Sequence, residues 1–110
     1  MSNFFTENQD ILFQCNRIDL EEIIRVREHD YTEWEKYPFA PRDYEDAKDN
    51  FQRILSVVGD ISGNFVAERA REVDELGSTF EDGKVTYAKG LEEAMDRLNQ
   101  AGLMGFFLER

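Results

Sequence analysis

The sequence predicts an all-α fold, a helical bundle built on one long helix. Apolar residues recur at spacings of three and four from Ala47 to Leu76, which is the period of a helix. The two prolines are confined to residues 38–41, so they interrupt none of this pattern. Only residues 80–87 carry the signals of a turn or small hairpin, a DG pair between β-forming residues.

The composition is that of one acidic globular domain. A chain of 110 residues is long enough for a modest core, and its 41% hydrophobic content argues against disorder. The net charge of −11 repels phosphate backbones and anionic membranes, so nucleic acid and membrane surfaces are not expected as partners. We interpret the acidity as a solvated surface.

The expected compartment is the cytoplasm. Cys15 is the sole cysteine, so no disulfide forms within the chain, and its apolar neighbours predict a buried thiol with no reactive role. There is neither a secretory leader nor a run of about 20 apolar residues, so we expect neither export by that route nor a membrane span.

Two short amphipathic helices are predicted first. Thr6 begins a capping box, TENQ, for a helix from Glu7 to Cys15, and Asp19 repeats the device for a second helix that ends near Glu28 or His29. Residues 31–41 then form an irregular connection. It contains four aromatic side chains, which either anchor it to neighbouring helices, the interpretation we prefer, or form a binding platform: Tyr31, Trp34, Tyr37 and Phe39.

The long helix is predicted from Tyr44 to Leu76, with Asp43 as its N-cap and Gly77 as its stop. Its apolar positions form one seam: Ala47, Phe51, Ile54, Val58, Ile61 and Phe65, then, after a small offset, Val66, Ala70, Val73 and Leu76. Gly59 and Gly63 lie within the helix, where glycine is unfavourable, and this predicts the close approach of a second helix. A phosphate-binding loop is excluded because no strand precedes them and no lysine follows in place.

After the hairpin, a last helix is predicted from about Leu91 to Ala101. Gly102 closes it, and Leu103 is positioned for the apolar contact with the helix that accompanies such C-caps. The segment GLMGFFLER follows, and its apolar residues are Leu103, Phe106, Phe107 and Leu108. They either complete the domain's own core or, as we expect, make contact with another domain or subunit.

No catalytic, cofactor-binding or metal-binding residue is expected. The chain has one histidine, His29, and one cysteine in separate segments, too few for a nucleophilic or hydrolytic metal site. His29 is interpreted as a helix-end cation or a surface residue. The carboxylates Glu68, Glu72 and Glu75 share helical spacing but lack a Glu-x-x-His, so we interpret them, with Arg69 and Arg71, as a solvated, partly salt-bridged face.

The order of these elements resembles the amino-terminal helical domain of acyl-CoA dehydrogenases. The resemblance is carried by residues at the end of the long helix, by DGKV at 82–85 and by the last helix: Ala67, Ala70, Glu72, Asp74 and Gly77, then Leu98, Ala101, Gly102, Leu103 and Gly105. It covers residues 43–110 as the domain's core, and residues 1–42 resemble the amino-terminal extension of a bacterial subgroup. We therefore expect a single helical domain, residues 1–110.

The resemblance implies a parent flavoenzyme that oxidises an acyl-CoA to an enoyl-CoA. In that family FAD and the catalytic glutamate belong to the middle and carboxy-terminal domains, so this chain would hold no cofactor and would be inactive alone. It would supply part of the wall of the acyl cleft and pack on the remaining domains, and acyl-CoA would bind only the full-length protein. The alternative is a free-standing acidic helical module that self-associates or binds a larger subunit.

Overall fold

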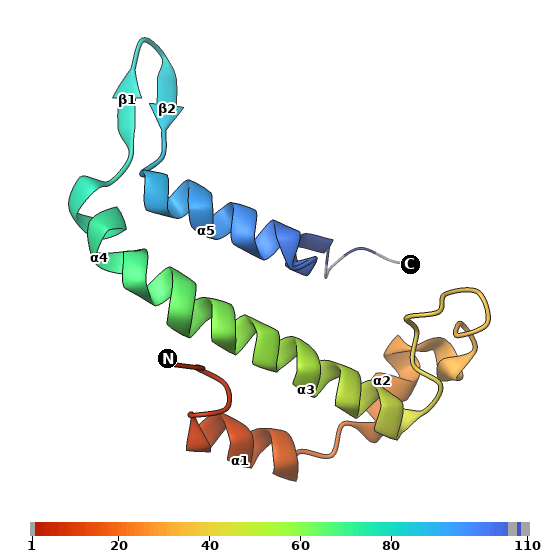
Figure 1. Cartoon of the computed structure of the whole chain (residues 1–110). Helices are drawn as coiled ribbons and strands as arrows, with labels where there is room; N and C mark the ends of the chain where they lie inside the picture. The colour runs from red at the N-terminus through yellow and green to blue at the C-terminus, as the bar shows by residue number, and fades with distance from the viewer. Residues whose placement is uncertain (1, 106–107, 109–110) are drawn as a thin grey trace. The chain divides into compact units, whose positions relative to one another are not determined.

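The computed structural model describes residues 2–105 and 108, and it is mainly helical with one two-stranded sheet, as predicted (Figure 1). Its contacts divide the chain into two compact units. One consists of residues 5–56, and the other consists of residues 57–110 together with the first four. The single domain of residues 1–110 stays a prediction.

In the unit of residues 5–56, α1 (Gln9–Arg17) begins two residues later than predicted. The predicted Thr6 cap is wrong, because the side chain of Asn8 accepts the N–H groups of Asp10 and Ile11, each at 3.1 Å. The side-chain oxygen of Asn8, two positions after Thr6, is therefore the N-cap of α1.

The second helix, α2 (Glu21–Arg27), is short and begins close to its predicted cap. The carboxylate of Asp19 accepts the N–H of Glu21 at 3.0 Å. Two neighbouring apolar residues of this amphipathic helix differ, since Ile24 is buried but Ile23 is 65% exposed. The predicted apolar face of this helix is therefore only partly covered.

The turn η1 (His29–Tyr31) follows, and all three of its residues have positive φ, at 50°, 56° and 58°. Left-handed conformation is costly for residues other than glycine. A 2.5 Å ion pair between Arg25 and Asp30 and a 2.7 Å hydrogen bond from the Thr32 hydroxyl to the His29 carbonyl tie this turn to its neighbours.

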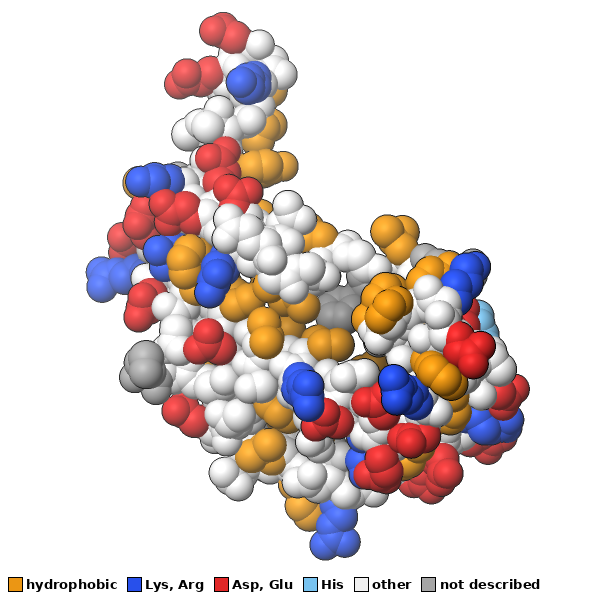
Figure 2. Space-filling model, turned by 45° about the vertical axis from the view of Figure 1, so that its right-hand side comes forward, with side chains coloured by type: hydrophobic (Ala, Val, Ile, Leu, Met, Phe, Trp, Pro, Cys, Tyr) orange, Lys and Arg blue, Asp and Glu red, His pale blue; other side chains and the backbone are white. Residues whose placement is uncertain are grey.

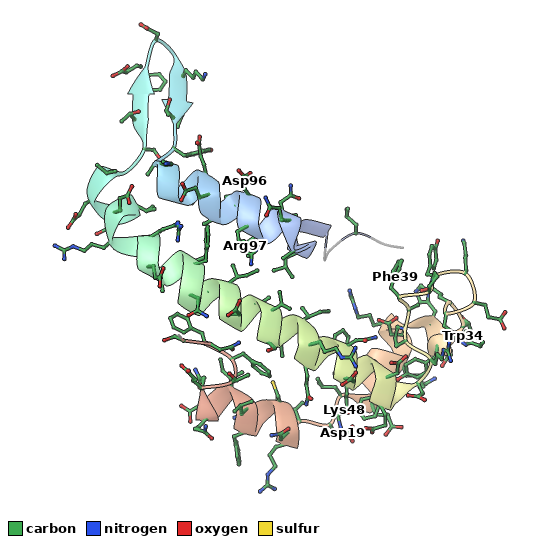
Figure 3. The ribbon with its side chains drawn as sticks, in the orientation of Figure 1. Asp19, Trp34, Phe39, Lys48, Asp96 and Arg97 are labelled. Atoms are coloured by element: carbon green, nitrogen blue, oxygen red, sulfur yellow. The ribbon has the colours of Figure 1, made fainter. Side chains whose placement is uncertain are left out.

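The aromatic connection does not anchor itself in the way the sequence predicted. Tyr31 and Tyr37 are half-buried, whereas Trp34 and Phe39 are exposed and project from the connection (Figure 3). Arg42 covers the Trp34 ring with its guanidinium carbon 5.1 Å from the centroid. Core anchoring is therefore wrong for Trp34 and Phe39, because Trp34 lies against the Arg42 guanidinium and Phe39 lies against the Tyr37 ring, with the ring centroids 5.8 Å apart.

The long helix has the predicted bounds. It consists of α3 (Tyr44–Ile61), the π-helical segment η2 (Ser62–Val66) and α4 (Ala67–Leu76), which we call together the spine. The Asp43 carboxylate accepts the N–H of Asp46 at 2.9 Å, and Gly77 ends the spine with a φ of 62°. These are the predicted N-cap and stop.

The π-helical segment was not predicted. Within it the N–H of Ala67 donates to the carbonyl of Ser62, five residues back instead of four. A π turn adds one residue to the helix, and it lies where the apolar seam steps from Phe65 to Val66. The offset in the seam was the sequence signal for this segment.

The glycines of the spine do approach another part of the chain, but the predicted second helix is wrong. A Cβ on Gly63 would overlap the backbone carbonyl oxygen of Ser2. The N–H of Phe4 donates to the Gly59 carbonyl at 3.0 Å. Residues Ser2–Phe4, which belong to no helix, thus occupy the place where a helix was expected.

The hairpin and the last helix complete this unit. Strands β1 (Thr79–Glu81) and β2 (Lys84–Thr86) pair antiparallel around Asp82 and Gly83, which both have positive φ, as the DG pair predicted. Helix α5 (Lys89–Gln100) then runs back along α4 and η2 (Figure 1).

Each unit has few buried apolar residues, and alanines are frequent among them. They are Phe5, Ile24, Ala40 and Ala47 in the unit of residues 5–56, and Ile61, Ala88 and Ala94 in the other unit. No large side chain in the described part of the chain is fully buried. None of the helices in the described ranges, 2–105 and 108, has the length and apolar character that crossing a bilayer requires.

Candidate interaction surface

The carboxy-terminal segment lies beyond a glycine cap. Helix α5 ends at Gln100, and Gly102, with a φ of 74°, donates its N–H to the Asn99 carbonyl at 2.9 Å. Of the predicted contact residues, Leu103 begins η3 (Leu103–Gly105) and is half-buried, whereas Leu108 is 77% exposed. Phe106 and Phe107 lie outside the described residues.

The hairpin carries an exposed apolar side, which was not predicted. Phe80 and Val85 are direct partners in the register, so their side chains share one face of the sheet. Phe80 is 71% exposed and Val85 is 52% exposed. Figure 2 shows hydrophobic side chains along one side of the hairpin and charged ones toward its tip. The alternation of apolar and polar residues around the DG pair was the signal.

The contact between α4 and α5 centres on Arg69. Its Nε donates to Glu93 Oε2 at 2.9 Å, its Nη1 donates to the Phe65 carbonyl at 3.0 Å, and its guanidinium carbon lies 3.7 Å from the Phe65 ring centroid. The prediction that Arg69 lies on a solvated face is therefore wrong, because this side chain joins the two helices.

The charge of Glu93 is fixed by the same contact. The hydrogen bond from Arg69 lowers the pKa of Glu93, and Lys89, with Nζ 3.5 Å from Glu93 Oε1, acts in the same direction. Glu93 is therefore ionised at neutral pH and accepts hydrogen bonds only. In this state it joins α5 to α4 through the hydrogen bond from Arg69.

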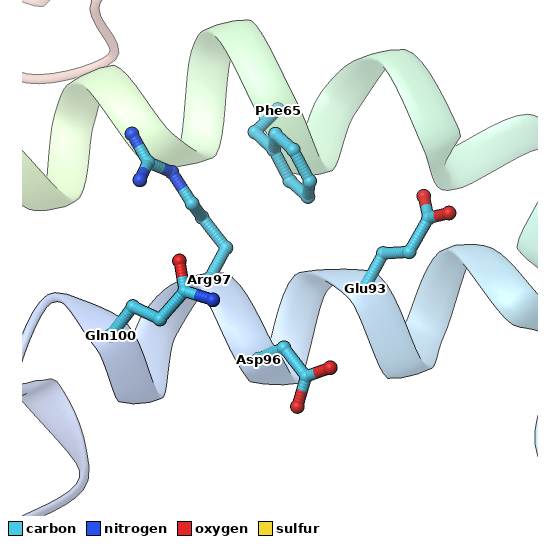
Figure 4. Close-up of a pocket in the computed structure, with 5 residues that line it drawn as sticks. All are labelled: Phe65, Glu93, Asp96, Arg97 and Gln100. Carbon is cyan, nitrogen blue, oxygen red and sulfur yellow. The ribbon is translucent and has the colours of Figure 1, made fainter.

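A shallow groove of about 260 Å³ lies between η2 and α5, lined by Phe65, Glu93, Asp96, Arg97 and Gln100. Figure 4 shows the Arg97 side chain directed toward the opposite helix and Asp96 directed away from it. The described lining contains no histidine or cysteine, and its ionisable groups are Glu93, Asp96 and Arg97. The groove is a surface feature between packed helices.

The other side chains considered for a catalytic or metal-binding role do not form a cluster in the part of the chain that the structure describes. The imidazole of His29 is 68% exposed, with Nδ1 3.3 Å from Glu33 Oε1, which fits the predicted surface role. Arg71 pairs with Glu75 at 2.8 Å, as expected of a salt-bridged face. Burial and then Glu21 raise the pKa of Tyr31, so its phenol is neutral at neutral pH. In residues 2–105 and 108, no three His, Cys, Asp or Glu side chains are placed to hold a metal ion.

The described residues thus offer apolar surface and salt bridges. Comparison with known proteins found no matching family model, no matching curated protein and no matching solved structure.

Proposed function

We propose that this chain serves as the amino-terminal helical domain of a cytoplasmic flavoenzyme of the acyl-CoA dehydrogenase type. It contributes shape and packing surface, including part of the wall of an acyl cleft, to an enzyme that oxidises acyl-CoA to enoyl-CoA. FAD and the catalytic base belong to the other domains of such an enzyme. The chain binds no acyl-CoA by itself and gains its role by packing on those domains.

The observation that carries the proposal is the imbalance between buried and exposed apolar side chains. Alanines dominate the buried set, while Leu76, Phe80 and Leu108 are more than half exposed in the unit that holds the resemblance. Among them Phe80 shares one face of the hairpin with Val85, and an exposed apolar face of this kind marks a surface that another protein surface covers. A domain that packs on neighbouring domains has such surfaces.

The positions of the glycines also support the proposal. Gly77, Gly83 and Gly102 have φ values of 62°, 75° and 74°, which disfavour residues with a Cβ. Two of them, Gly77 and Gly102, end helices, and Gly83 forms the hairpin turn. The residues that carry the resemblance thus include those that determine where each element of this unit stops.

The second candidate is a free-standing acidic module that associates with itself or with a larger subunit. The exposed side of the hairpin favours it, because a two-stranded hairpin is marginally stable without a partner surface. Sedimentation equilibrium tests this candidate. It predicts a concentration-dependent dimer that Phe80→Ser weakens, while Thr79→Ser, the neighbouring strand position directed to the other face, leaves the dimer unchanged.

The coding sequence past the codon for Arg110 tests the first candidate directly. The proposal predicts an open reading frame that continues into a glycine-bearing loop and a β-domain. A stop codon at that position contradicts it and favours the free-standing module.

A further inference from the structure

Residues Ser2–Phe4, which we call the N-terminal strap, are bound to the spine at two points. The N–H of Ser2 donates to the side-chain oxygen of Asn64 at 2.7 Å. The N–H of Phe4 donates to the backbone carbonyl of Gly59 at 3.0 Å. Because the strap shares a compact unit with residues 57–110, both contacts lie within one body.

The strap fits closely against the spine between these two points. Gly63 is buried, and the space where its Cβ would be is filled by the Ser2 backbone. The Asn64 amide is oriented by its own helix, since its Nδ2 donates to Asp60 Oδ1 at 2.6 Å. The amide oxygen is thereby left to accept from Ser2.

The two anchor points lie on either side of a change in helix register. Gly59 belongs to α3, whereas Asn64 belongs to the π-helical segment η2, whose Ala67 N–H reaches back five residues to Ser62. The angle between Gly59 and Asn64 around the helix axis depends on whether this turn is π or α. The relative placement of the two strap contacts therefore differs between the π and the α register.

The sequence of η2, SGNFV, contains no proline that would disrupt an α-helix here. A π turn is rare and persists where other contacts favour it over the α form. A contact shifts such an equilibrium only by binding one form better than the other. The strap is placed to meet this condition, because its contacts at Gly59, Gly63 and Asn64 lie on both sides of the change in register.

We propose that the N-terminal strap is a conformational device that holds the spine in its π register. When the strap is displaced, η2 reverts to α-helix and the residues after it change phase by one position. One residue corresponds to a rotation of about 100° and a shift of about 1.5 Å along the axis. The rotation turns α4, the hairpin and α5 relative to residues 57–61, and with them the exposed side of the hairpin. This inference does not depend on the proposed function.

Scalar couplings across hydrogen bonds test the proposal on the whole chain by NMR. In the wild-type chain the Ala67 amide couples to the carbonyl carbon of Ser62, and the Phe4 amide couples to that of Gly59. The double variant Phe4→Pro with Asn64→Ala removes one donor and one acceptor, so neither strap bond can form. The proposal predicts that the Ala67 coupling moves from Ser62 to Gly63. A coupling that stays on Ser62 overturns it.

A second variant keeps the test decisive if the double variant does not fold. Gly63→Ala retains both hydrogen-bonding groups and improves helix propensity, but its methyl group would overlap the Ser2 carbonyl. Loss of the Phe4 coupling together with transfer of the Ala67 coupling to Gly63 supports the proposal. Persistence of the Ser62 coupling after the Phe4 coupling is lost overturns it, and so does transfer of the Ala67 coupling to Gly63 while the Phe4 coupling is retained. The control for Asn64→Ala is Asn99→Ala, which replaces an exposed asparagine of α5. It should keep both wild-type couplings.

Discussion

Gly90 of α5 and Val73 of α4 approach so closely that a Cβ on Gly90 would lie 2.9 Å from Val73 Cγ2. The next neighbour of that Cβ would be Arg69 Cβ at 3.2 Å. Both atoms are held close to the backbone of α4, and the valine is stiff because it is β-branched. The missing side chain of Gly90 therefore sets the distance between the two helices.

Gly90→Ala is expected to destabilise the chain although alanine is the better helix former. Overpacking of a close contact costs about 1–3 kcal/mol, and the gain in helix propensity offsets up to about 1 kcal/mol of it. We expect a net loss of about 1 kcal/mol in the free energy of unfolding, measured by urea denaturation.

Two further variants separate crowding from the general effect of a glycine substitution. Gly105→Ala is the matched control, because no heavy atom lies within 4 Å of the added Cβ, and it should change stability by less than about 0.5 kcal/mol. Val73→Ala introduced together with Gly90→Ala removes the nearest obstacle. If Gly90→Ala lowers the free energy of unfolding as much in the Val73→Ala background as in the wild type, the contact is not the cause.

Glu93→Gln is expected to reduce stability in a pH-dependent way. The Arg69 hydrogen bond lowers the folded-state pKa of Glu93 below its ordinary value of 4.5, so the ionised carboxylate stabilises the fold above that value. This stabilisation is lost as the pH falls through the lowered folded-state pKa. The wild type should therefore be the more stable near neutral pH, and the two should converge in acid.

Thermal melts across the pH range check this expectation. Glu92→Gln removes the same charge from the preceding residue of α5 and serves as the control. A Glu93→Gln deficit that is the same at every pH would show that shape, not charge, matters at this position.

Asp43→Ala tests the start of the spine. The Asp43 carboxylate accepts the Asp46 N–H, and the Asp46 carboxylate in turn accepts the Arg42 N–H at 3.0 Å. Loss of an N-cap costs about 1 kcal/mol, and asparagine caps nearly as well as aspartate. We therefore expect Asp43→Ala to lower the free energy of unfolding by about that amount and Asp43→Asn to change it little. Equal losses in the two variants would mean that the negative charge, not the cap, stabilises this end.

The spine shows which features a sequence can predict. Asp43 and Gly77 act through local backbone geometry, so the spine's two ends follow from nearby residues alone. The partner of Gly63 is Ser2, more than sixty residues away, and no local pattern identifies it. The π turn lies between these cases, since the offset in the apolar seam marks its place but not its cause.

The candidate interaction surface likewise has features that the sequence predicts and features that it does not. The DG turn predicted the hairpin, but the exposure of Phe80 depends on what the rest of the fold covers. Arg69 was interpreted as solvated because its neighbours in sequence are charged, whereas its partner Glu93 comes from another helix. Periodicity reveals which side of a helix is apolar, and the tertiary partner of a polar side chain has no comparable signal.

Gly83→Ala is expected to disrupt the hairpin and leave the helices intact. Asp82 and Gly83 have φ values of 50° and 75°, and alanine in this left-handed region costs about 1 kcal/mol or more. A two-stranded hairpin has little stability to lose. Cross-strand NOEs between Thr79 and Thr86 should weaken or vanish while the far-ultraviolet circular dichroism of the helices is kept.

Asp82→Asn is the control for the hairpin variant, because asparagine tolerates positive φ. It should keep the cross-strand NOEs. If Gly83→Ala also keeps them, the strands are stabilised by contacts outside the turn.

The central claim is that these helices supply packing surface and that the reactive groups lie elsewhere. The most direct test is to assay the purified chain of 110 residues with FAD, a series of acyl-CoA thioesters and an artificial electron acceptor. The account predicts no flavin absorbance after gel filtration and no reduction of the acceptor above the rate without protein. Flavin that co-elutes with the chain, or turnover of any thioester, would contradict it.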